Sequence, residues 1–119
     1  MDSRSPFACL LIGRPTLRRM IKLGVLAALD QRIAVRYQMP GMTPEETSTY
    51  ITHHLHLAGR TSTLFTYDAL ALIHDASRGK PRTVNNLALA ALVATCATGK
   101  KLVDESAARA VVTEVIATE

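Results

Sequence analysis

Residues 77–86, SRGKPRTVNN, separate two stretches of helical pattern in this chain of 119 residues. Gly79 can adopt a positive φ and end the helix before it. Pro81 lacks an N–H and has a φ that suits the first turn of the helix after it. The pattern therefore places Arg82 at a helix N-terminus, an unusual position for a cation because this end of a helix carries partial positive charge.

The local sequence offers a plain explanation of Arg82. Its side chain would point into solvent, or it would pair with Asp75 or Asp104. A second explanation is that Arg82 contacts the phosphates of a bound nucleotide, and this depends on the family that the chain resembles.

From residue 41 onward the sequence predicts four helices joined by short connections. Thr43 can cap the first of them and Glu46 can complete a capping box. Thr66 is the expected cap of the second helix, and the last is expected to begin at Asp104. Residues 84–98 are so rich in Ala and Leu that other helices are expected to surround them.

The first forty residues predict a β-α-β order. Residues 7–13, FACLLIG, form a continuous apolar run that is typical of a strand covered on both faces. A helix opens at Pro15, and residues 25–29 add a second short helical stretch. Residues 33–39 alternate between apolar and polar, which indicates a half-exposed strand. The expected fold is mostly α, with a small α/β remnant in residues 1–40 followed by a four-helix bundle in residues 41–119.

Composition narrows the class of protein. Hydrophobic residues make up 48% of the chain, which has no Trp, so a core of Ala, Leu, Val and Ile is expected. The net charge of +4 is a mild basic bias. Cys9 and Cys96 have no second cysteine nearby and are expected to be buried thiols in a reducing cytoplasm. No apolar segment approaches the length of a membrane span, so a soluble cytoplasmic protein without a membrane partner is expected.

The central stretch resembles a known element. Gly79-x-Pro81-Arg82, followed by VNNL at residues 84–87, resembles sensor 2 in the helical lid of AAA+ ATPases. The sequence of this motif is similar to that of the ExeA and TniB group. Residues 10–15, residues 29–33 and Val103-Asp104 also resemble this group. The resemblance thus covers nearly the whole chain, and it implies the end of a AAA+ α/β core followed by its lid.

The resemblance implies roles for particular residues. Arg82 would be the sensor 2 arginine that reaches the phosphates of ATP, and Gly79 and Pro81 would shape that nucleotide-binding turn. Arg32 would be an arginine finger that reaches the γ-phosphate in a neighbouring subunit; the alternative is an arginine that only solvates a helix end. Arg14 falls in the sensor 1 region, where the group more often has Gln, so this chain departs from the pattern there.

The sequence contains no Gly-x-x-x-x-Gly-Lys-Ser/Thr motif, and no acidic residue follows a hydrophobic strand to hold magnesium. We interpret the chain as a truncated module that begins before the sensor 1 strand, and we expect it neither to bind ATP and Mg nor to hydrolyse ATP alone. The intact family protein would bind both, form oligomers and act with DNA and a transposase. A secretion-type ExeA ATPase is the alternative within the family.

Basic residues gather on the predicted helix after Pro15. Arg14, Arg18, Arg19 and Lys22 could contact DNA phosphates, or they could form a solvated helix face, because no aromatic residue lies among them for base stacking. The His-rich run 53–56 predicts no metal site, since adjacent helical positions diverge by about 100°. Outside the ATPase family, a non-enzymatic helical module that binds DNA or protein is the other hypothesis.

Overall fold

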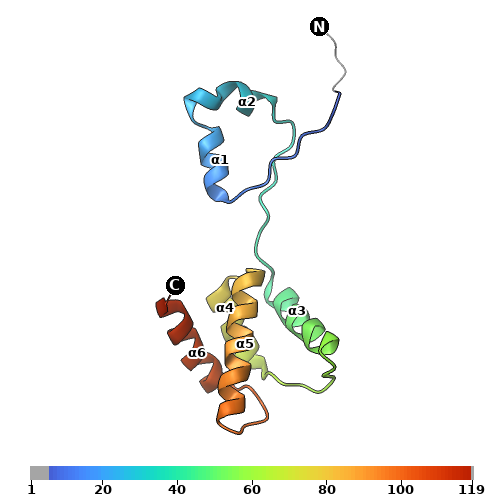
Figure 1. The fold of residues 1–119 in the computed structure, drawn as a ribbon, viewed down its shortest axis with the longest axis vertical. Helices are drawn as coiled ribbons and strands as arrows, with labels where there is room; N and C mark the ends of the chain where they lie inside the picture. The colour runs from blue at the N-terminus through green and yellow to red at the C-terminus, as the bar shows by residue number, and fades with distance from the viewer. Residues whose placement is uncertain (1–5, 119) are drawn as a thin grey trace. The chain divides into compact units, whose positions relative to one another are not determined.

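The computed structural model describes residues 6–118 and is mostly helical (Figure 1). Its elements are, in chain order, α1 (Pro15–Ile21), η1 (Gly24–Leu26), α2 (Ala27–Arg32), α3 (Pro44–Leu57), α4 (Tyr67–Ser77), α5 (Pro81–Ala97) and α6 (Glu105–Thr118). The chain divides into two compact units, Met1–Gln38 and Met39–Glu119. We call the first the N-terminal unit and the second the bundle. The predicted mostly helical class, with four helices in the second part of the chain, is confirmed.

The two predicted strands of the N-terminal unit are wrong. Residues 7–13 and 33–39 lie outside helices, but neither belongs to a strand in the described part of the chain. Leu10 and Ile12 are 82% and 83% exposed, and Val35 is 83% exposed. The patterns indicate residues suited to a sheet, yet a strand forms only where a neighbouring strand accepts its backbone hydrogen bonds, and here no neighbour is present among the described residues.

The helices of the N-terminal unit are short and enclose little. Ile21 is buried, Leu17 is half-buried, and Met20 is 54% exposed, so only part of the expected apolar face of α1 is covered. Arg36 donates to the carbonyl oxygen and the carboxylate of Asp30, which ties residue 36 to α2.

The predicted burial of both cysteines is also wrong, because Cys9 and Cys96 are exposed. Cys9 lies in the uncovered segment 7–13, where no sheet forms to bury it. Cys96 lies in the last turn of α5 on a face that no other helix covers.

Side-chain caps begin three of the bundle's helices where the sequence predicts them. Thr43 and Glu46 form the complete capping box of α3, with bonds of 3.1 Å and 2.8 Å to each other's backbone amide. Thr66 Oγ1 accepts the amide of Ala69 at the start of α4. Asp104 Oδ1 accepts the amide of Ala107 at the start of α6, and this bond, aided by Lys100, lowers the pKa of Asp104.

The core of the bundle is aliphatic. Its largest fully buried side chains include Ile73 of α4, with Val84 and Leu87 of α5. Phe65 in the α3–α4 loop and Val103 in the α5–α6 loop form a parallel bridge, and both side chains are buried. These loops are thereby fixed to the same end of the core.

One face of α5 is not covered as predicted. Leu89 and Val93 are 64% and 62% exposed, although Leu87 and Ala91 on the opposite face are fully buried. Figure 1 shows α3 and α6 on opposite sides of α5. The helix therefore has neighbours on several sides but keeps an apolar stripe in contact with solvent.

No helix among residues 6–118 combines the length and the apolar character that a membrane crossing requires.

Candidate functional site

The turn between α4 and α5 has two successive residues in the left-handed region. Arg78 has φ 55° and ψ 27°, and Gly79 has φ 73°. The positive φ predicted for Gly79 is confirmed, and Arg78 is the one non-glycine residue with positive φ in the described chain. Such a conformation costs a side-chain-bearing residue roughly 1–2 kcal/mol, so contacts around the turn must hold it in place.

Those contacts come from Ser77 and from the segment that enters α3. The Ser77 hydroxyl, 2% exposed as a residue, accepts the amide of Gly79 at 3.1 Å and donates to the carbonyl oxygen of His74 at 3.1 Å. The amide of Met42 donates to the carbonyl oxygen of Gly79 at 2.8 Å. The turn is thus fixed by α4 on one side and by the start of α3 on the other.

The two segments approach so closely that both need glycine. A Cβ on Gly79 would lie 2.1 Å from the carbonyl oxygen of Met42, and a Cβ on Gly41 would lie 2.1 Å from the carbonyl oxygen of Arg78. Neither distance can exist between real atoms, and both neighbouring atoms belong to backbone. Gly41 is a residue of this site that sequence reasoning missed; its signal was the Pro40-Gly41 pair in front of the capping box.

Pro81 occupies the first turn of α5, as predicted, and Lys80 is the N-cap residue. No side chain in the described part of the chain caps α5, and the first turn of this helix has no acidic residue. The N-terminal amides of this helix and its dipole favour an anion close to them.

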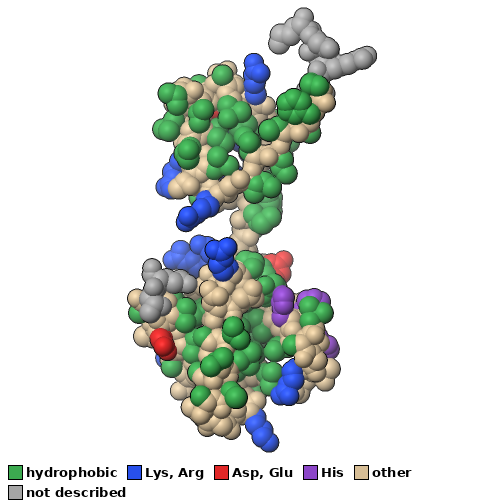
Figure 2. All heavy atoms as spheres, in the orientation of Figure 1, with side chains coloured by type: hydrophobic (Ala, Val, Ile, Leu, Met, Phe, Trp, Pro, Cys, Tyr) green, Lys and Arg blue, Asp and Glu red, His purple; other side chains and the backbone are tan. Residues whose placement is uncertain are grey.

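Three cations surround this helix start. Arg78, Lys80 and Arg82, which we call the basic turn, are all exposed. Figure 2 shows Lys and Arg side chains gathered at the end of the bundle where α5 begins. Sequence reasoning named Arg82 alone and missed Arg78 and Lys80, although the alternation of cations at residues 78, 80 and 82 was visible.

The structure tests the plain explanation of Arg82. Among the described residues Arg82 forms no ion pair with Asp75 or Asp104; Asp104 pairs instead with Lys100, at 3.6 Å, and caps α6. Arg82 is exposed to solvent, which agrees with the first of the two explanations that need no ligand and not with the second, an ion pair. Within residues 6–118, a cation is thus left beside a helix N-terminus that has neither a side-chain cap nor a carboxylate paired with Arg82.

The other predicted site residues belong to the N-terminal unit. Arg14 is the N-cap residue of α1, and the cations Arg18, Arg19 and Lys22 are exposed along α1 and at its end. Arg18 and Lys22, four positions apart, share a face of α1, whereas Arg14 precedes the helix with extended backbone, so the predicted helical spacing does not reach it. Arg14 does not follow a strand, because segment 7–13 is not one.

Arg32 is the last residue of α2 and is exposed. The helix predicted before it is present, whereas the strand predicted after it is absent. The structure therefore places Arg32 at a helix end, and its role in a neighbouring subunit stays a prediction.

Across the described residues no group of three or more His, Cys, Asp or Glu side chains could hold a metal ion. His53 and His54 are both exposed, and the ring of His54 packs against Tyr50 with centroids 4.5 Å apart.

The chain is 34% identical over 98 residues to General secretion pathway protein A of Aeromonas hydrophila, a match that covers 82% of the chain. This match supports an ExeA-like AAA+ family. The chain spans 18% of that relative's length. No family model matches the chain, and no solved structure matches it.

The similarity to General secretion pathway protein A gives the basic turn a context. The Gly79-x-Pro81-Arg82 motif lies between α4 and α5 of a four-helix unit, which is the position that the resemblance implies for sensor 2. Its arginine is exposed and forms no ion pair with a carboxylate among the described residues, so its guanidinium N–H groups can donate to a ligand.

Proposed function

We propose that the bundle is the lid of an ExeA-like AAA+ ATPase and that Arg82 senses the phosphates of bound ATP. One observation carries this proposal: a turn that is hydrogen-bonded on two sides presents Arg82, beside Arg78 and Lys80, at a helix N-terminus that no side chain of the described residues caps. A polyphosphate would compensate these charges and accept hydrogen bonds from the guanidinium.

The chemistry of phosphoryl transfer explains why a lid would carry such an arginine. Charge on the transferring phosphoryl group is stabilised by positioned cations, since the protein contributes mainly orientation and electrostatics. The P-loop and the magnesium ligands would come from a part of the ATPase that this sequence does not contain. Arg32 as an arginine finger, Arg14 in the sensor 1 region, and oligomer formation belong to the same proposal.

Two biological branches follow from the family. The relative's name supports a secretion-type ATPase. The motif resemblance to TniB supports the other branch, an ATP-dependent helper of transposition that acts with DNA and a transposase. We propose the secretion branch on the strength of the match, with transposition as the second candidate.

A chimera tests the proposal that this chain works as a lid. The 98-residue matching segment of General secretion pathway protein A is replaced by the corresponding segment of this chain. If the bundle is an ExeA-like lid, the chimera hydrolyses ATP, whereas the same protein with the segment deleted does not. A chimera that folds, as judged by a cooperative thermal melt, but shows no turnover above the deletion control would contradict the proposal.

A further inference from the structure

The first turn of α5 lies outside the core of the bundle. Val84 is the first buried residue of this helix, so Pro81, Arg82 and Thr83 precede the part that the core holds in place. The start of a helix is commonly held by a side-chain cap, but no side chain of the described residues caps α5. The position of Arg82 therefore depends on how the preceding turn is anchored.

Ser77 anchors that turn at two points. Its hydroxyl accepts the amide of Gly79 at 3.1 Å, and its carbonyl oxygen accepts the amide of Lys80 at 3.2 Å. The carbonyl oxygen of Lys80 in turn accepts the amide of Val84 at 2.9 Å. A chain of hydrogen bonds thus runs from the end of α4 to the first buried residue of α5.

The Ser77 hydroxyl is itself fixed. It donates to the carbonyl oxygen of His74, one turn earlier in α4, and Ser77 is buried. The hydroxyl thus both donates and accepts within the protein. A buried hydroxyl that is satisfied in this way holds its partners in one geometry, because a bond lost inside the protein is not replaced by water.

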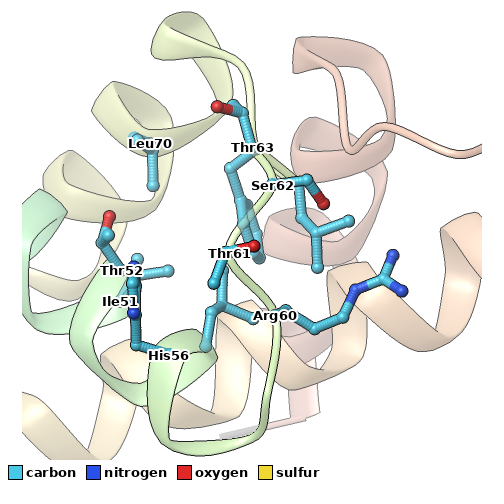
Figure 3. A pocket seen from close by; sticks show the side chains of 11 residues that line it. Ile51, Thr52, His56, Arg60, Thr61, Ser62, Thr63 and Leu70 are labelled. Carbon is cyan, nitrogen blue, oxygen red and sulfur yellow. The ribbon is translucent and has the colours of Figure 1, made fainter.

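The basic turn lies outside two hollows that open on the bundle. One hollow is enclosed by the α3–α4 loop (Figure 3) and the other lies between α3 and α5, and neither is lined by Arg78, Lys80 or Arg82. The walls of these hollows therefore do not orient the three cations. Their placement depends on the backbone of the turn, which Ser77 holds.

We infer that Ser77 is a positioning residue for Arg82. Its hydroxyl acts in place of a side-chain cap and holds the first turn of α5 in the orientation in which the guanidinium meets phosphate. This inference rests on the proposed nucleotide sensing and deepens it, because Ser77 would touch no ligand and would act only through Arg82. The hydrogen bonds of a guanidinium to phosphate are directional, so a small displacement of the helix start is enough to weaken them.

Loss of the Ser77 hydroxyl should leave most of the fold in place. In Ser77→Ala the backbone bonds of Lys80 to residue 77 and of Met42 to Gly79 remain available. Val84 and Leu87 still hold α5 in the core. The amide of Gly79 alone loses its partner, and the first turn of α5 gains freedom to move.

The functional test is a double-mutant cycle in the chimera with General secretion pathway protein A. ATP dissociation constants are measured for the chimera, for Ser77→Ala, for Arg82→Ala and for the double variant, at a temperature at which thermal melts show all four folded. Ser77→Ala should weaken ATP binding about tenfold. It should cost less than about twofold once residue 82 is Ala, since a positioning residue acts only through the group that it positions.

Two other variants serve as matched controls. Thr98 Oγ1 donates to the carbonyl oxygen of Thr95 at 3.0 Å, as Ser77 does to that of His74, but at the opposite end of α5, about 25 Å from its start. Arg60 is an exposed cation of the α3–α4 loop, and in Figure 3 its side chain extends away from the other labelled side chains. Thr98→Ala and Arg60→Ala should each bind ATP like the parent chimera.

Hydrogen exchange without nucleotide tests the geometry separately. In the 119-residue chain, Ser77→Ala should speed amide exchange at Gly79 and Lys80 about tenfold or more relative to the buried amides of Ile73 and Leu87. Thr98→Ala should leave exchange at Gly79 and Lys80 at the parent rate.

The outcomes separate the positioning role from the nucleotide sensing on which it rests. An Arg82→Ala chimera with the ATP affinity of its parent would contradict nucleotide sensing, and the positioning role with it. If Arg82→Ala weakens binding but Ser77→Ala does not, or if the two losses simply add, Ser77 is a structural residue and only the positioning role is overturned. Unchanged exchange at Gly79 and Lys80 in Ser77→Ala would overturn that role as well.

Discussion

The amide of Met42 donates to the carbonyl oxygen of Gly79 across 2.8 Å, which joins the segment that enters α3 to the turn that presents Arg82. The two segments are far apart in sequence, yet their backbones lie so close that neither Gly41 nor Gly79 has room for a side chain. Any movement of α3 against α4 would therefore displace the basic turn. The position of Arg82 is a property of the bundle and not of its own helix alone.

Substitution of Gly79 tests this crossing. Gly79→Ala forces a Cβ to 2.1 Å from a backbone oxygen and also places a side chain at φ 73°. The left-handed conformation costs roughly 1–2 kcal/mol, and forced overpacking adds about 1–3 kcal/mol. We expect a loss of unfolding free energy of about 2–5 kcal/mol in chemical denaturation.

Gly99→Ala is the matched control for Gly79. Gly99 has φ 74°, but a Cβ there meets nothing within 4 Å, so only the conformational cost of roughly 1–2 kcal/mol should appear. Equal losses for the two variants would show that the crossing tolerates a side chain, contrary to the structure.

Two buried threonines should respond in opposite directions to loss of the hydroxyl. Thr47 is fully buried, and its Oγ1 lies 2.8 Å from His74 Nδ1. Thr47→Val leaves the half-buried imidazole without this partner and should destabilise the bundle by about 1–3 kcal/mol.

The buried Oγ1 of Thr95 has no hydrogen-bond partner in the described structure. Thr95→Val removes a desolvated hydroxyl and keeps the shape of the side chain, so it should be neutral or stabilising by up to about 1 kcal/mol. Chemical denaturation of Thr47→Val, Thr95→Val and the parent chain measures these changes as shifts of the unfolding midpoint. Destabilisation by both to the same extent would contradict the assigned hydrogen bonding.

DNA contact by the N-terminal unit would be weak and governed by salt. Arg14, Arg18, Arg19 and Lys22 can offer phosphate contacts only, so an affinity independent of sequence and steeply reduced by salt is expected. Four neutralised phosphates would give a slope of about −3.6 for the logarithm of the binding constant against that of salt concentration. Arg18→Gln with Lys22→Gln should roughly halve this slope, whereas salt-resistant binding to one sequence would argue against these residues.

The bundle was the more predictable part of the fold because its signals are local. Thr43 with Glu46, Thr66, Gly79 and Pro81 act within one turn of helix, and each is present as predicted. The strands at residues 7–13 and 33–39 were not predictable from their own pattern, because a strand depends on a neighbour that the pattern does not contain.

The site was partly predictable for the same reason. A motif placed Arg82 at the start of a helix, which a local pattern can do. It could not reveal that Gly41 crosses Gly79, that Ser77 supports the turn, or that Leu89 and Val93 remain exposed, since these depend on how distant segments pack.

The most direct test of the account is the ATP affinity of the chimera carrying Arg82→Ala, measured beside its thermal melt. A lost charge-assisted bond to phosphate is worth roughly 1.5–3 kcal/mol, so ATP binding should weaken by about ten- to a hundredfold. Arg82→Lys should restore only part of the ATP affinity that Arg82→Ala loses, because an ammonium lacks the planar fork of the guanidinium. The melting temperature should hardly change, since Arg82 is exposed while Val84 and Leu87 hold α5 in the core. An Arg82→Ala chimera that binds ATP as tightly as its parent but melts many degrees lower would show that Arg82 is structural and would contradict nucleotide sensing.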